Sequence, residues 1–151
     1  MGSLQISSSV AVDVPPALAW SVVADFARNP EWQNGMKAAE WVTKPPLAVG
    51  SRYVQHAGFL GREIRSLFEV VELEPGRLVT IDTIEGTFPI TVTRTVIPAN
   101  GGCLISADVR GDAGGVFRLM TPLLRVLVKR SVDGDYRRLK RLLESPPGTT
   151  D

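Results

Sequence analysis

The residues of this sequence that could do chemistry are polar side chains at positions where a strand pattern points inward. Phe88, Ile90 and Val92 alternate with threonines and so mark the buried face of a strand. A further step of two residues places Arg94 on the same face. A guanidinium in a protein interior is costly unless it is paired or solvated. Arg94 is therefore the first candidate for a functional charge.

Three interpretations of Arg94 are open. It forms a structural ion pair with Asp82 or Glu69, or reaches solvent with its charged end. It anchors a carboxylate or phenolate of a ligand, which a fixed guanidinium fork suits. Or a β-bulge turns it outward. Asp82 follows Thr80 by two residues and is expected to share the interior, and Tyr53 is expected to face inward from another strand. If the protein is an enzyme, Arg94, Asp82 and Tyr53 are the candidate catalytic residues.

Metal and nucleophile chemistry find little support. His56 is the only histidine and Cys103 the only cysteine, so a zinc site would need several carboxylates, which zinc seldom uses alone. A Ser-His-Asp triad would have to use His56, and the sequence has no GxSxG, phosphate-binding glycine loop or CxxC motif. We expect no metal and no cofactor, and His56 is expected to be a surface or partly buried polar residue.

The composition is that of an ordinary globular protein, with a net charge of +1 that implies no particular partner. One cysteine allows no internal disulfide, no basic and apolar leader opens the chain, and no apolar run approaches about 18 residues. We therefore expect a cytoplasmic protein, a monomer or homodimer, with no nucleic-acid partner and no stable membrane insertion. A single domain is expected over residues 1–151, with an ordered core at about 5–144.

A long amphipathic helix must help to position the polar candidates. Apolar residues recur at steps of three and four from Val116 to Glu144, and the first half, up to Val128, is apolar nearly all round. Such a helix must be covered on more than one side or must face a cavity. Pro122 predicts a kink in it.

The preceding chain predicts one strand, two short helices and six further strands. The first strand alternates from Ile6 to Val14, and Pro15-Pro16 opens the first helix. Asn29-Pro30 is expected to cap and begin the second. Strands are then expected at residues 36–42, 51–57, 62–73, 78–84, 88–96 and 103–109. Asn100-Gly101-Gly102 predicts a hairpin between the last two, and helices beside an antiparallel sheet make an α+β domain.

Several of these stretches resemble the START-like (SRPBCC) superfamily, which contains polyketide cyclases, lipid-transfer domains and ligand carriers of the plant-allergen type. The resemblance rests on Val12-Asp13-Val14-Pro15-Pro16 running through Trp20 to Asp25, on Trp32, on Val49-Gly50, and on a closing Leu139-Lys140 to Glu144. It covers roughly residues 6–144. It implies a helix-grip fold, in which a curved antiparallel sheet of about seven strands wraps around the C-terminal helix and leaves an apolar cavity.

The residues expected to bind a ligand there lie on the inward faces of the strands and on the helix. They are Trp32, Tyr53, Phe68, Phe88, Ile90, Val92, Arg94, Ile105, Phe117, Met120 and Leu124. Phe59 and Leu60, together with Gly114 and Gly115, are expected to form a gate, because glycines give backbone freedom beside apolar side chains.

Three functions are hypotheses at this point. The favoured one is binding or transport of a hydrophobic or aromatic small molecule in the cavity. The alternative is an enzyme of the polyketide cyclase or aromatase type acting without metal. The third is a regulatory or interaction module, resembling a toxin–antitoxin protein, with the same fold. Fold alone does not decide among them.

Overall fold

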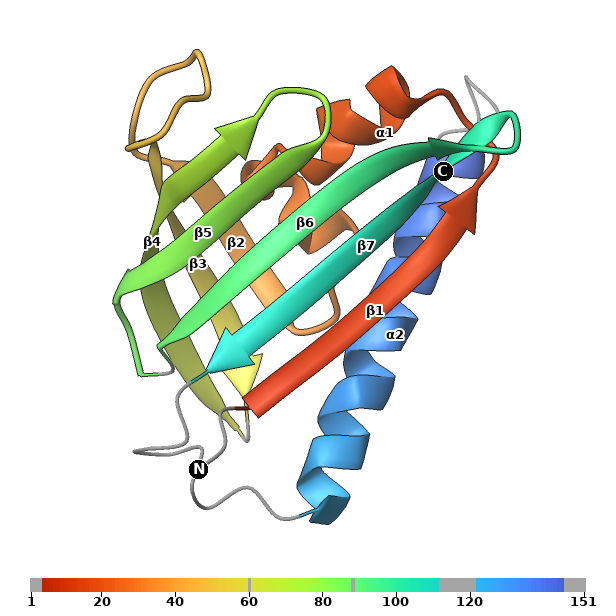
Figure 1. Cartoon of the computed structure of the whole chain (residues 1–151). Coiled ribbons are helices and arrows are strands. Elements are labelled where there is room, and N and C mark those ends of the chain that lie inside the picture. Colours follow the sequence, from red (N-terminus) through yellow and green to blue (C-terminus); the bar gives the residue numbers. More distant parts are fainter. Residues whose placement is uncertain (1–3, 60, 88, 112–121, 146–151) are drawn as a thin grey trace.

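The computed structural model describes residues 4–59, 61–87, 89–111 and 122–145. Its strands form one antiparallel sheet of seven strands in the order β1-β7-β6-β5-β4-β3-β2 (Figure 1). The strands are β1 (Leu4–Val12), β2 (Met36–Trp41), β3 (Arg52–Phe59), β4 (Arg62–Glu74), β5 (Leu78–Glu85), β6 (Ile90–Ala99) and β7 (Gly102–Gly111). The sheet curls around the C-terminal helix α2 (Pro122–Glu144), which confirms the predicted α+β helix-grip fold (Figure 1).

Two local features bend and close the sheet. The pairing of β4 with β5 shifts register between Leu67 and Phe68 and again between Val70 and Glu72, and such irregularities bend a strand and increase its twist. The hairpin between β6 and β7 turns at Asn100 and Gly101, whose φ angles are 47° and 84°. A two-residue turn with both angles positive matches the twist of the flanking strands, so the predicted hairpin is confirmed.

Two short helices connect β1 to β2: α1 (Pro16–Val23) and the 3₁₀ helix η1 (Phe26–Glu31). α1 packs against β6 and β7. The prediction that Asn29 caps a helix starting at Pro30 is wrong. The cap is Asp25, whose side chain accepts a hydrogen bond from the Ala27 amide at 3.2 Å, so η1 begins three residues before Asn29. Asn29 is instead buried inside η1, where its side chain meets the sheet.

The helix α2 buries one side and exposes the other. Leu139 is fully buried against the sheet, whereas Leu123 and Leu127 are 69% and 51% exposed. The expectation that this part of the helix is covered on more than one side or faces a cavity therefore does not hold for Leu123 and Leu127. At 3.6 residues per turn they point about 160° and about 120° around the helix from Leu139, and Figure 1 shows the first turns of α2 extending past the end of β1. The kink predicted at Pro122 depends on residues 116–121, which lie outside the described residues. No helix in the described part of the chain has the length and apolar character to cross a membrane.

The apolar core has two parts. One joins α1 and α2 to the β6–β7 side of the sheet and includes Val23, Ile105 and Leu139. The other lies over β3, β4 and β5 and includes Tyr53 and Phe68. The concave face of the sheet is thus packed with apolar side chains at two places.

Candidate functional site

A cavity of about 230 Å³ lies between the concave face of the sheet, the loop after η1 and the helix α2. Its apolar walls come mainly from the strands. They are formed by Met36, Phe68, Ile81, Ile90, Val92, Val109 and Val132. Its polar groups come from every side of the cavity. They belong to Asn29, Gln33, Asn34, Tyr53, Gln55, Arg94, Asp135 and Tyr136. A partly enclosed cavity whose walls combine apolar side chains with convergent polar groups has the character of a small-molecule site.

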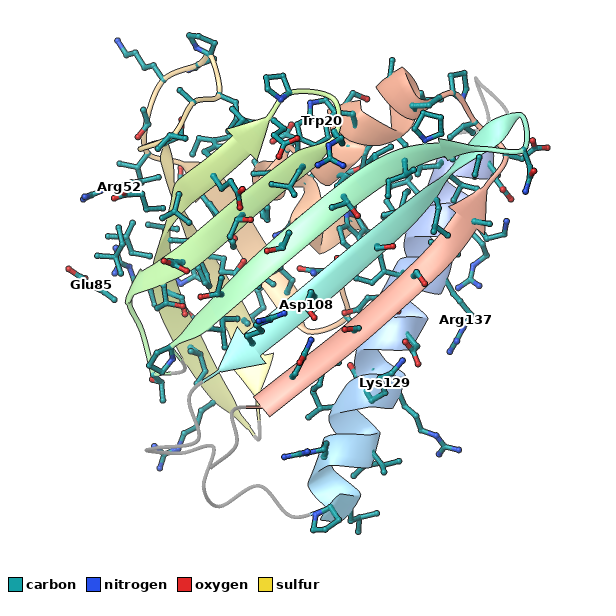
Figure 2. All side chains as sticks on the ribbon, in the orientation of Figure 1. Trp20, Arg52, Glu85, Asp108, Lys129 and Arg137 are labelled. Carbon is teal, nitrogen blue, oxygen red and sulfur yellow. The ribbon has the colours of Figure 1, made fainter. Side chains whose placement is uncertain are left out.

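A larger hollow of about 580 Å³ lies on the outer side of β1, β7 and β6, beside the part of α2 from which Lys129 and Arg137 project (Figure 2). Its walls carry serine and threonine hydroxyls, and Lys129 is already paired with Asp133 at 2.7 Å. None of the side chains that line it is both charged and buried. The inner cavity is therefore the better candidate site.

Arg94 lies on the concave face of β6 and is 2% exposed, so the predicted inward orientation is confirmed. Its Nη1 donates hydrogen bonds to the Val23 carbonyl oxygen at 3.0 Å and to Asn29 Oδ1 at 3.1 Å. Its guanidinium carbon lies 4.2 Å from the centre of the Phe26 ring and 4.9 Å from that of Trp32, within cation–π range. Its Nε is buried and has no hydrogen-bond partner among the described residues.

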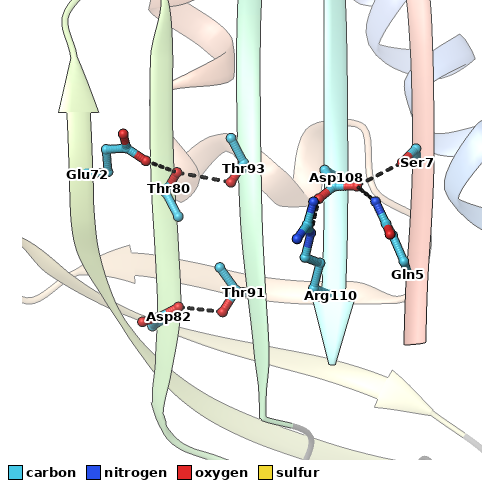
Figure 3. A network of polar contacts seen from close by, with 9 residues as sticks. All are labelled: Gln5, Ser7, Glu72, Thr80, Asp82, Thr91, Thr93, Asp108 and Arg110. Atoms are coloured by element: carbon cyan, nitrogen blue, oxygen red, sulfur yellow. Dashed lines mark hydrogen bonds and ion pairs between the residues drawn. The ribbon is translucent and has the colours of Figure 1, made fainter. Parts of the chain in front are cut away.

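The predicted ion pair of Arg94 with Asp82 or Glu69 is wrong. Asp82 lies on the outer face of β5, where it accepts a hydrogen bond from the Thr91 hydroxyl at 2.6 Å (Figure 3). Glu69 accepts from Arg52 at 3.0 Å. The inward residues of β5 are Val79 and Ile81, which are almost fully buried. Asp82 does not line the cavity and is not placed to act there with Arg94.

The outer face of the sheet carries a polar network instead (Figure 3). Asp108 accepts hydrogen bonds from Gln5 at 2.9 Å, Ser7 at 2.8 Å and Arg110 at 2.7 Å. Burial acts to raise the pKa of Asp108, but these three donors and the charge of Arg110 hold it below its ordinary value. The network joins β1 to β7 across the face away from the cavity.

Two tyrosines face the cavity. Tyr53 is 1% exposed and stacks between Phe26 and Phe68, with ring centres 4.9 and 5.1 Å apart. Burial raises the pKa of Tyr53, and the nearby charge of Arg94 opposes that rise. Burial likewise raises the pKa of Tyr136, against the charge of Arg94 and a hydrogen bond from it. Both phenols are therefore neutral at pH 7 and carry a proton that they could donate.

Asp135 is a buried carboxylate at the edge of the cavity, 8% exposed. Its Oδ1 accepts from the Asn34 amide at 3.0 Å and from Arg138. Burial raises the pKa of Asp135, against the hydrogen bond from Asn34 and the charges of Arg138 and Arg94. Arg138 is its direct ionic partner, so Asp135 does not neutralise Arg94 by contact.

The other residues predicted to bind the ligand, together with those predicted to form a gate, fall into three groups. Phe68, Ile90 and Val92 line the cavity. Trp32 and Ile105 are buried in the neighbouring core, where Trp32 packs on Tyr136 with ring centres 4.9 Å apart. The third group lies outside the described residues. It comprises Leu60, Phe88, Gly114, Gly115, Phe117 and Met120, and the side chains of Phe59 and Leu124. His56 lies on β3 and its Nδ1 is 3.1 Å from Glu63, away from the cavity.

Sequence reasoning missed several residues that line the cavity, among them the polar residues Asn29, Gln33, Asn34, Asp135 and Tyr136. Asp135 had a detectable signal, because it stands seven residues after Val128 on the stripe that faces the sheet. Asn29 had the pattern of a helix cap, which concealed its role. Gln33 follows η1 in irregular chain, where no periodicity indicates a direction.

Comparisons with known proteins agree with this architecture. A family model described as "Polyketide cyclase / dehydrase and lipid transport" matches residues 3–144. A START superfamily protein from Mycobacterium smegmatis has a similar structure, with a TM-score of 0.78 and 14% identity over 95% of this chain and 98% of that one. The Zhui aromatase/cyclase from Streptomyces sp. R1128 has a TM-score of 0.75 and 14% identity over 95% of this chain and 94% of that one. A protein from Thermus thermophilus has a TM-score of 0.77 and 17% identity over 93% of this chain and 97% of that one. The TM-scores show a shared fold, and at these low identities the likeness shows the fold alone. A search of curated proteins found no match.

Proposed function

Because the chain belongs to the polyketide cyclase/dehydrase and lipid transport family, we propose that it binds a hydrophobic or aromatic small molecule in the cavity beneath α2. The observation that carries the proposal is the cavity itself. Its walls include members of both apolar clusters, with aromatic and aliphatic groups from the strands. Close-packed interiors rarely keep voids larger than a water molecule, so a partly enclosed space of about 230 Å³ within the core supports a binding role.

The size of the cavity limits the ligand. An engineered apolar cavity of about 150 Å³ is known to hold benzene. The cavity beneath α2 is about 230 Å³, which suits one aromatic ring with substituents, or two small fused rings. Its volume lies below the usual range of about 300–1,000 Å³ for drug-sized ligands. A long acyl chain would need more space than the described residues enclose.

A cyclase or aromatase activity is the second candidate, and a specific observation favours it. The neutral phenols of Tyr53 and Tyr136 lie in the same cavity as Arg94. A guanidinium can stabilise negative charge that develops on a carbonyl oxygen, and a phenol can supply a proton. An aromatase/cyclase from Streptomyces shares the fold. Residues Arg94, Tyr53 and Tyr136 are the group to test for this activity, and Asp82 is excluded because it faces outward.

Indole is a suitable probe for the binding function because its two fused rings match the cavity. A titration followed by the NMR chemical shifts of the backbone amides is expected to show saturable binding, with the largest shifts at the residues of β3–β6 that line the cavity. The variant Ile90→Trp places a larger side chain in the cavity, since Ile90 lines it and is only half-buried. It is expected to weaken indole binding at least tenfold.

Ile97→Trp is the matched control, because Ile97 lies on the same strand but is 42% exposed. It is expected to leave indole affinity unchanged. Equal affinities for the two variants, or no saturable binding by the wild type, would overturn the proposal.

A further inference from the structure

We infer that the ligand is a small aromatic carboxylic acid that carries a hydroxyl group, with its carboxylate bound at Arg94. This inference rests on the proposed function and specifies the chemistry of the same cavity. It draws on three observations: a buried cation that no carboxylate of the described residues contacts directly, unpartnered carboxamide oxygens in the same walls, and the cavity volume.

The positive charge of Arg94 is not neutralised by contact. The two groups that accept hydrogen bonds from its Nη1, the Val23 carbonyl and Asn29 Oδ1, are both neutral. The carboxylate of Asp135 is hydrogen-bonded to Arg138 and to the Asn34 amide. A charge that is 2% exposed and has only neutral acceptors is unusual, because buried charges are normally paired. The Nε of Arg94 is also buried without a partner among the described residues. An anion bound in the cavity would neutralise the charge of Arg94 and accept a hydrogen bond from its Nε.

A carboxylate fits this position better than other anions. Carboxylic acids ionise near pH 4, whereas phenols ionise near pH 10, so at pH 7 only the carboxylate brings a full negative charge. Its two oxygens match the spacing of guanidinium N–H groups. Among the described residues that line this cavity Arg94 supplies the one guanidinium, which balances the single charge of a carboxylate but only half the charge of a phosphate dianion.

Two further groups call for a donor on the ligand. Gln33 Oε1 and Gln55 Oε1 line the same cavity and are buried without hydrogen-bond partners in the described structure. Leaving such a group unpaired is unfavourable, and a ligand hydroxyl would donate to it. The aromatic rings of Tyr53 and Phe68 form the wall beside these groups and favour a flat ring between the two polar ends.

The test compares acids with matched neutral amides. Calorimetry with wild-type protein is expected to show 4-hydroxybenzoate and 3-hydroxybenzoate binding at least tenfold more tightly than the corresponding hydroxybenzamides. Benzoate is expected to bind more weakly than the better hydroxybenzoate. Equal affinities for the acids and the amides would overturn the inference. Since indole tests the cavity alone, indole binding without any preference for acids would leave the proposed function intact, and absence of both would refute both.

Asn29→Asp provides a second measurement, because it places a carboxylate where the Asn29 amide oxygen lies, 3.1 Å from Arg94 Nη1. This internal anion competes with the ligand's carboxylate. The variant is expected to lose at least tenfold in affinity for hydroxybenzoates while it still binds indole. Asn100→Asp makes the same change at the exposed β6–β7 hairpin and is expected to have no effect. Undiminished hydroxybenzoate binding by Asn29→Asp would contradict the inference. If Asn29→Asp does not fold, the wild-type comparison of acids with amides decides alone.

Discussion

Gly102 stands where β7 begins beside the end of β1, and replacing it with alanine should be strongly destabilising. A Cβ atom at this position would lie 2.2 Å from the Val12 carbonyl oxygen and 3.1 Å from the Asp13 Cα. Both neighbours are backbone atoms, so no side chain can rotate away to relieve the clash. Gly102 is a glycine because the backbone of β1 passes too close for any side chain.

The size of the effect follows from the contact distances. Ordinary contacts of a Cβ atom begin near 3.4 Å. The end of β1 would thus have to move by about 1 Å in a closely packed sheet. Overpacking in a core costs about 1–3 kcal/mol, and we place Gly102→Ala at about 3 kcal/mol because the obstructing atom belongs to the main chain. For a chain of this length the melting temperature should fall by about 6–12 °C.

Urea denaturation followed by circular dichroism measures this free energy of unfolding. Gly134→Ala is the matched control, because a Cβ there would meet only the ends of the Arg137 and Arg138 side chains at 3.8 Å. The control removes a glycine from the interior of α2 and is expected to stabilise the protein by about 0.5–1 kcal/mol. Both variants restrict the unfolded chain alike, so their difference isolates the clash. The reasoning is refuted if Gly102→Ala unfolds within about 1 kcal/mol of the wild type with an unchanged denaturant slope.

Three further predictions concern the core, the outer network and the thiol. Leu139→Ala is expected to lower the free energy of unfolding by about 2–5 kcal/mol, because Leu139 is fully buried. Leu127→Ala, at a half-exposed site, should change it by less than about 0.5 kcal/mol. Similar losses for the two variants in urea denaturation would contradict this packing. Asp108→Asn is expected to cost roughly 1–2 kcal/mol at pH 7. The pKa of Asp108 is lower in the folded than in the unfolded protein, so the stability difference between wild type and Asp108→Asn is fully present above the unfolded pKa, near 4, and is lost as the pH falls through the folded pKa. A stability difference that stays constant from about pH 7 to pH 2 would show that it does not come from the ionised carboxylate. Cys103 is 1% exposed and burial raises the pKa of its thiol, so an aromatic disulfide reagent should label it only in denaturant, and fast labelling of the folded protein would contradict the structure.

Most of the fold could be predicted from local patterns in the sequence. The alternation through Ile90 and Val92 places Arg94 on the buried face of β6, because successive side chains of a strand must point to opposite sides. Asn100-Gly101 predicts the hairpin, because both residues tolerate positive φ. The stripe through Leu139 and Leu143 predicts which side of α2 faces the sheet.

The strand β5 shows where such patterns fail. Apolar residues occur on both of its faces, since Val79 and Ile81 point inward while Leu78 and Ile84 lie on the other face. Alternation alone therefore gives two possible phases, and the sequence interpretation took the one that places Asp82 inside. Pairing with β4 and β6 fixes the phase, and that pairing is a property of the whole sheet.

The sequence by itself predicted a long C-terminal helix against a curved antiparallel sheet, and its alternation favoured an Arg94 that points into the space between them, with a bulge as the open alternative. These are consequences of backbone stereochemistry and of the periods of helix and strand, which neighbouring residues specify. Only the tertiary structure decided what Arg94 meets there. Two of its acceptors, the Val23 carbonyl and Asn29, are 71 and 65 residues away in the chain, and neither lies at a position that a periodic pattern marks. Which charges are paired and which stay open to a ligand is decided by packing between distant elements, because hydrogen-bond geometry depends on differences of an ångström that local sequence does not encode.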